Sequence, residues 1–185
     1  MKLGDADKSY LGYCVKGGTR YYTAQFTATA LATLVVTANR FYAMPFFVPI
    51  NFKVDRIAFN VTAQAAGQYA RVGIYHDNGL IYPGSLVLDG GEFVTTSGIK
   101  ETTISLVLFK GRLYWLVFCA SSTPTLRSIA VAGLSAVFLG LDSTLPTAPG
   151  VGYYYAWTYA ALPAIYPAGA TIHVAAMPGV FLRAA

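Results

Sequence analysis

From residue 41 onward, hydrophobic and polar positions alternate with a period of two, which is typical of β-strands that bury one face. The alternation slips once after Val54, before Ile57 resumes the apolar face, and such a slip predicts a β-bulge. Residues 112–120 are apolar on both faces, as expected for a strand at the centre of a sandwich. Strands are therefore predicted at residues 53–62, 71–75, 102–108, 112–120, 171–175 and 180–182.

Turn-forming residues separate these segments. Asp77-Asn78-Gly79 contains residues that tolerate a positive φ, and Tyr82-Pro83-Gly84 places Pro and Gly at turn positions. Asp89-Gly90-Gly91 and Lys110-Gly111 predict two further turns. Short strands with a turn signal about every 8–12 residues are typical of sandwiches and jelly rolls. The expected fold class is therefore all-β, a jelly-roll-like β-sandwich over residues 41–185.

Residues 1–40 differ from the rest of the chain, because they are rich in Gly, Thr, Ala and Tyr and have no clear period of two. We interpret this segment as an N-terminal extended arm that folds onto a neighbour or attaches the domain to a larger particle. A short helix at residues 27–33 is the alternative.

The composition favours an assembly over an isolated domain. Hydrophobic residues make up 55% of the chain and charged residues 11%, against about 25% charged residues in an average soluble domain. Between residues 111 and 185, the only charged side chains are Arg112, Arg127, Asp142 and Arg183. A segment with so few charges is either buried within its own domain or part of a subunit interface, and we favour the interface.

The charge and cysteine patterns argue against several other classes. The net charge of +5 is scattered, without a basic run or a basic helix, so no nucleic-acid partner is expected. The longest weakly polar run, at residues 129–141, is too short for membrane insertion, and the N-terminus lacks the apolar stretch of a signal peptide. We therefore expect folding in a cytoplasm. Cys14 and Cys119 are expected to be buried free thiols, with a disulfide between them as the alternative.

The sequence carries no strong catalytic or metal-binding motif. The two histidines, His76 and His173, lack metal-ligand spacing and are interpreted as structural. Asp89 and Glu92 are the candidate carboxylate pair of a glycosidase, but they flank a Gly-Gly pair and are interpreted as solvated turn residues. A calcium-binding loop around Asp77 is a minor alternative. We expect no enzyme activity, no cofactor and no metal.

An aromatic cluster is the most informative feature of the C-terminal part. Tyr153, Tyr155, Trp157 and Tyr159 would share one face of a strand, with Tyr154 on the other face. Such a row can stack on sugar rings while its phenol groups bond to sugar hydroxyls, or it can pack in a core or a subunit interface. The four residues on the shared face are therefore predicted to make core, subunit or glycan contacts.

The order of several short motifs resembles a β-sandwich domain of tail-fibre and other minor virion proteins of tailed bacteriophages. The similarity covers residues 40–185 and is carried by structural motifs. These include Phe41-Tyr42-Ala43-Met44-Pro45, Arg71-Val72-Gly73-Ile74-Tyr75, Leu88-Asp89-Gly90-Gly91, Leu113-Tyr114-Trp115-Leu116, Gly152-Tyr153-Tyr154-Tyr155 and Val180-Phe181-Leu182-Arg183.

The resemblance implies a homo-oligomer, commonly a trimer, that is displayed on a virion assembled in the host cytoplasm. Its partners would be other virion proteins and host surface carbohydrate. The leading hypothesis is a trimeric tail-fibre or receptor-binding component. A capsid decoration or head-fibre protein that stabilises the head is the first alternative, and a free-standing carbohydrate-binding module is an alternative of another class.

Overall fold

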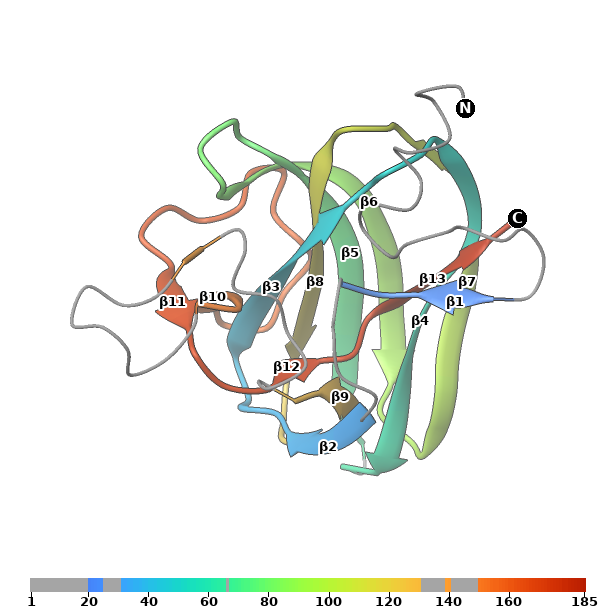
Figure 1. The fold of residues 1–185 in the computed structure, drawn as a ribbon. Coiled ribbons are helices and arrows are strands. Elements are labelled where there is room, and N and C mark those ends of the chain that lie inside the picture. The colour runs from blue at the N-terminus through green and yellow to red at the C-terminus, as the bar shows by residue number, and fades with distance from the viewer. Residues whose placement is uncertain (1–19, 25–30, 66, 131–138, 141–149) are drawn as a thin grey trace.

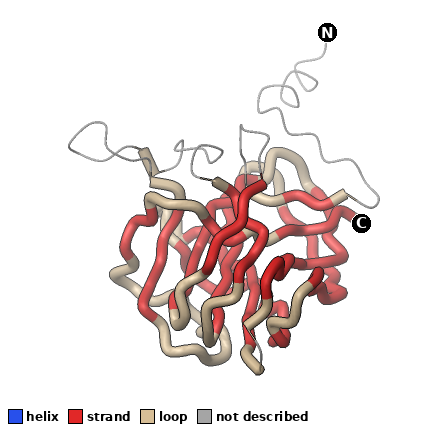
Figure 2. The backbone as a smooth tube through the Cα atoms, turned by 90° about the horizontal axis from the view of Figure 1, so that it is seen from below, coloured by secondary structure: helices blue, strands red, loops and turns tan. Residues whose placement is uncertain are grey.

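The computed structural model of the chain describes residues 20–24, 31–65, 67–130, 139–140 and 150–185. All regular elements in these residues are β-strands, and they form two antiparallel sheets (Figures 1 and 2). The predicted all-β sandwich is therefore confirmed. Within the same residues, no helix is long and apolar enough to cross a membrane.

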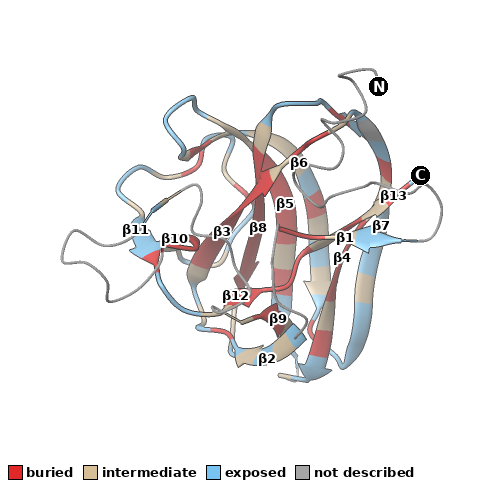
Figure 3. Ribbon diagram, viewed as in Figure 1, coloured by how far each residue is buried: buried red, intermediate tan, exposed pale blue. Residues whose placement is uncertain are grey.

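The six-stranded sheet contains three of the six predicted strand segments, those at residues 71–75, 112–120 and 171–175. In spatial order its strands are β11 (Thr171–His173), β10 (Gly152–Ala156), β3 (Arg40–Phe47), β8 (Leu113–Ala120), β5 (Tyr69–Asp77) and β6 (Pro83–Val94). Strand β8 lies between β3 and β5 and is buried along almost its whole length, as predicted for residues 112–120. Figure 3 shows β3 and β8 as the buried centre of the molecule.

The seven-stranded sheet joins the two ends of the described chain. Its main path is β1 (Tyr21–Tyr22), β13 (Phe181–Ala184), β4 (Phe52–Ala63), β9 (Thr125–Ile129) and β12 (Met177–Pro178). Strand β2 (Leu31–Val35) pairs with β9, and β7 (Gly98–Leu108) pairs with β4. The register of β4 against β7 shifts between Val54 and Arg56, so the predicted β-bulge is confirmed.

One predicted turn is wrong. Asp89-Gly90-Gly91 lies inside β6, where the pairing register with β5 shifts between Arg71 and Gly73. Gly91 has a φ of 90°, so the glycines form a bulge that bends the strand without reversing it. The predicted turn at Asp77-Asn78-Gly79 does reverse the chain, and Asp77 Oδ2 accepts a hydrogen bond of 2.8 Å from Gly79 N.

Part of the predicted N-terminal arm is paired into the seven-stranded sheet. Tyr21 and Tyr22 pair with β13, and residues 31–35 pair with β9. Thr23 Oγ1 donates a 2.6 Å hydrogen bond to Val180 O, and Val36 is buried in the core. Residues 1–19 and 25–30, with Cys14 and most of the alternative helix at 27–33, lie outside the described residues; residues 31–33 are strand.

Two hydrophobic cores stabilise the sandwich. The main core lies between the sheets and includes Phe46, Phe59, Ile74 and Phe118. A second cluster lies on the outer face of the six-stranded sheet, where residues 157–170 fold back over β3, β8 and β5. Its fully buried members include the large side chains of Phe41, Tyr75 and Trp115. We call it the outer cluster.

A partly exposed ion pair connects β4 to β13 in the seven-stranded sheet. Arg183 Nε and Nη2 donate hydrogen bonds of 2.8 and 2.7 Å to the two carboxylate oxygens of Asp55. Such a bidentate pair holds both side chains in a defined orientation. The hydrogen bonds from Arg183 hold the pKa of Asp55 below its ordinary value.

This ion pair is expected to make the stability of the protein depend on pH. Because the pKa of Asp55 is lower in the folded state, its carboxylate stabilises the fold above the unfolded pKa of about 4 and loses this effect as pH falls through the folded pKa. Asp55→Asn should therefore flatten the fall of the urea midpoint on acidification. The same slope in both proteins would show that Asp55 does not contribute to acid sensitivity.

Candidate binding surface

The predicted aromatic residues all pack against the outer cluster. Tyr153 and Tyr155 lie on β10, which ends at Ala156, and Trp157 and Tyr159 continue the row into the following loop. Tyr154 packs against the main core instead, so the predicted division between two faces is confirmed along β10. The prediction that Trp157 and Tyr159 lie on the same strand is wrong, because β10 ends at Ala156.

Their contacts show that this row is built into the fold. The ring centroid of Tyr153 lies 5.4 Å from that of Trp115, and Tyr153 Oη donates a 3.2 Å hydrogen bond to Ile81 O. Tyr159 Oη donates to Glu92 Oε2 at 2.9 Å, and burial followed by this bond raises the pKa of Tyr159. Trp157 Nε1 is buried and has no hydrogen-bond partner in the described part of the chain. Glycan or subunit contact by the four residues stays a prediction.

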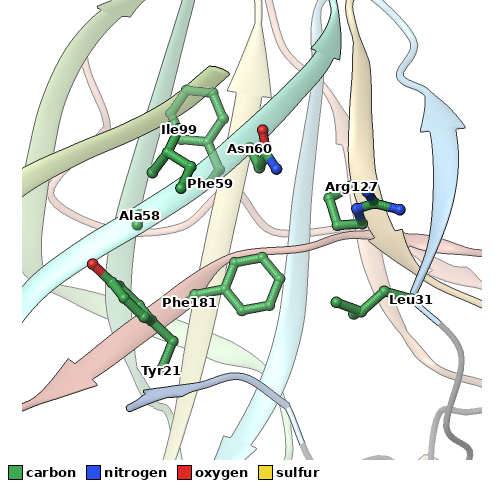
Figure 4. A pocket seen from close by; sticks show the side chains of 8 residues that line it. All are labelled: Tyr21, Leu31, Ala58, Phe59, Asn60, Ile99, Arg127 and Phe181. Carbon is green, nitrogen blue, oxygen red and sulfur yellow. The ribbon is translucent and has the colours of Figure 1, made fainter. Parts of the chain in front are cut away.

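A shallow apolar depression lies on the opposite side of the sandwich, on the outer face of the seven-stranded sheet (Figure 4). Its volume is about 200 Å³. Ala58 and Asn60 come from β4, whereas Tyr21 and Phe181 come from the neighbouring strands β1 and β13. We call it the sheet-face depression, and its lining residues are Tyr21, Leu31, Ala58, Phe59, Asn60, Ile99, Arg127 and Phe181.

The side chains around this depression expose large apolar groups to solvent. Ile99 is 69% exposed, and Leu31 and Tyr21 are 44% and 41% exposed. Val35 on β2 and Val107 on β7 lie an even number of residues from Leu31 and Ile99, so their side chains point to the same face of the sheet. Both valines are also exposed. Because large apolar groups gather on one sheet face, this face has the character of an interaction surface.

The charged groups beside the depression are largely paired. Tyr21 Oη donates a hydrogen bond to Glu101 Oε2, and burial followed by this bond raises the pKa of Tyr21. Arg56 Nε lies 3.8 Å from Glu101 Oε1. Arg127 has no carboxylate within ion-pair distance in the part of the chain that the structure describes. The surface therefore offers apolar area together with one available guanidinium group.

The edge of the same sheet is open along β7. Among the described strands, β7 pairs only with β4, so the backbone groups along its other side have no strand partner. Ile99, Thr103, Ser105 and Val107 are exposed on this strand, whereas Lys100 and Glu101 place charges at one end. A long edge strand with few charges is a template for pairing with another chain.

Three of the polar groups considered for catalysis or metal binding have partners within the fold. Asp89 and Glu92 flank the bulge of β6 and both lie within ion-pair distance of Arg71, at 3.2 and 3.5 Å. His173 Nε2 lies 3.1 Å from Ala176 O. No group of three or more His, Cys, Asp or Glu side chains that could hold a metal ion is found in the described residues. Cys119 is a buried free thiol, and burial raises its pKa to about 12.

Sequence reasoning did not find the sheet-face depression, because its members come from strands that are far apart in the chain. A local signal was Ile99, an isoleucine on the polar face of an alternating strand. No protein-family model matches the chain, and no curated protein matches it either.

Proposed function

We propose that this chain is a structural protein of a bacteriophage virion, a tail-fibre or receptor-binding component that assembles as a homo-oligomer, with three copies. The sequence resemblance described above supports the virion role. The observation that carries the assembly is the sheet-face depression, where Ile99 stands 69% exposed beside Tyr21, Leu31 and Phe181.

The proposed occupant of this face is a second copy of the same chain. Fully burying one isoleucine contributes about 1.5–3 kcal/mol, so covering several such side chains would favour association. Ile99 lies on β7, and the open edge of this strand would allow backbone pairing at the same contact. Phe181 and Arg127 bring part of the charge-poor C-terminal segment to this face, in agreement with an interface there.

We expect Ile99→Asp to weaken self-association by at least about tenfold, because it replaces a large apolar side chain with a charged group in a contact that must lose water. Light scattering after size-exclusion chromatography, over a range of concentrations, measures the effect. Ile165→Asp is the matched control, since Ile165 is 64% exposed but lies in the chain over the other sheet. A monomeric wild-type protein, or equal association of the wild type and Ile99→Asp, would contradict the proposed interface.

The virion role is tested separately by antibody labelling of purified particles under the electron microscope. Label at the tail tip or fibres supports the proposed function. Label spread over the head would replace it with capsid decoration. A soluble monomer that is retained on a polysaccharide and absent from particles would replace it with a free-standing carbohydrate-binding module.

A further inference from the structure

A second, polar depression lies at the end of the six-stranded sheet, apart from the sheet-face depression, and its lining residue Leu113 also packs against the outer cluster. It has a volume of about 510 Å³ and includes His76 and Asp77 at the end of β5, Ser85 on β6, and Arg112 just before β8. Gly79 and Gly111 bring backbone to its rim from two turns. It is broadly open to solvent, and we call it the polar basin.

Asp77 is already occupied by structural hydrogen bonds. Its Oδ1 accepts a 3.0 Å bond from Trp115 Nε1, and its Oδ2 accepts a 2.8 Å bond from Gly79 N. The carboxylate therefore fixes the turn at the rim of the basin. Its negative charge stays close to the basin, but neither oxygen lacks a donor.

His76 and Arg112 provide the available donors of the basin. The side chains of both residues have no hydrogen-bonding or ion-pair partner among the described residues. The His76 ring packs against the Tyr114 ring at 5.4 Å, and the Arg112 guanidinium carbon lies 5.5 Å from the Phe109 ring centroid. These ring contacts orient the two side chains without using their N–H groups.

The two donors are close enough for their charges to interact. Partial burial and then the positive charge of Arg112 lower the pKa of His76. An anion placed between them would reverse that effect, because it would neutralise Arg112 and favour the imidazolium. The charged groups that face His76 in the basin are Arg112 and Asp77.

We propose that the polar basin binds the carboxylate of an acidic saccharide. The planar guanidinium of Arg112 can donate two parallel hydrogen bonds to a carboxylate, and His76 supplies a third donor. The Ser85 hydroxyl and the backbone at Gly79 and Gly111 border the remaining space, which suits the hydroxyl groups of a sugar ring. This site is separate from the proposed subunit contact and does not depend on it.

Calorimetric titration of the full chain with glucuronate, glucose and inorganic phosphate tests the proposal. We expect glucuronate to bind at least about tenfold more tightly than glucose or phosphate, because only glucuronate satisfies both the cationic donors and the ring-sized space. Because the pKa of His76 lies below its ordinary value of about 6.5, glucuronate binding should tighten as the pH falls from about 7 towards about 5, and this change should be lost in His76→Gln. Equal binding of phosphate and glucuronate would overturn the saccharide assignment, and equal binding of glucose and glucuronate would overturn the carboxylate site.

Arg112→Ala should weaken glucuronate binding at least about tenfold, and Arg112→Lys should restore only part of it, because lysine keeps the charge but lacks the two-pronged geometry. Arg112 is exposed, so circular dichroism should show the fold of both variants unchanged. Arg20→Ala is the matched control, since this exposed arginine lies beside β1 of the other sheet, lines neither depression and should leave binding unaltered. Unchanged binding in Arg112→Ala, or equal loss in Arg20→Ala, would overturn the proposal.

Discussion

Trp115→Ala is expected to lower the free energy of unfolding by about 3–5 kcal/mol, the cost of removing a large buried aromatic side chain. Trp115 is fully buried in the outer cluster and lies 5.4 Å from Tyr153, measured between ring centroids. Its Nε1 also donates to Asp77, so the substitution removes a hydrogen bond that helps to fix the turn after β5. Urea denaturation followed by circular dichroism measures the change.

The other tryptophan of the chain is the control for this prediction. Trp157 is only partly buried, and its buried Nε1 has no partner among the described residues. Trp157→Phe should therefore cost less than about 1 kcal/mol, because it keeps an aromatic ring and removes an unpaired N–H group. If Trp115→Ala cost no more than Trp157→Phe, the outer cluster would not contribute to stability as its burial indicates.

Gly152→Ala is expected to cost about 3 kcal/mol, near the upper end for overpacking in a core. A Cβ atom at this position would lie 2.4 Å from the backbone oxygen of Ala43 and 2.8 Å from Met177 Cε. The methionine can move, but Ala43 O belongs to β3, which pairs with β10. The substitution would push β10 away from the sheet and loosen Tyr153 and Tyr155 together with it.

Gly91→Ala separates this steric effect from the general cost of replacing a glycine. Gly91 has a φ of 90°, and a Cβ atom added there would meet no other atom within 4 Å, so its replacement strains only the local backbone. We expect a loss of about 1–2 kcal/mol in the same urea experiment. If Gly91→Ala were the more destabilising change, close packing between β3 and β10 would not explain the glycine at position 152.

The alternation of hydrophobic and polar residues was sufficient to predict the strands that bury one face or both. Full or partial burial of Ile104, Leu106 and Leu108 on one side of β7 requires the period of two that the sequence shows. The pattern failed at Gly90 and Gly91, because two glycines suit a turn and a bulge equally well. Only the pairing with β5 distinguishes these structures, and that pairing depends on residues elsewhere in the chain.

The periodicity of the sequence could not predict which residues contact the aromatic row. Alternation placed Tyr153 and Tyr155 on one face, but it carries no information about what covers that face. Residues 157–170 cover it themselves, where Tyr166 Oη donates a 2.8 Å hydrogen bond to Phe41 O across a separation of 125 residues. Contacts of this kind depend on the path of a loop, and local sequence does not determine that path.

The pairing of β1 with β13 has a consequence for the folding rate. The bond from Thr23 to Val180 spans 157 residues, so the seven-stranded sheet closes only after distant parts of the chain have met. Closing such a loop costs conformational entropy before the contacts that it permits are made. All-β domains dominated by such pairings fold in roughly milliseconds to seconds, and this chain should be among the slow ones. During that interval the edge of β7 would be exposed to other incompletely folded chains and could pair with them. Dilution and low temperature should therefore raise the yield of refolded protein.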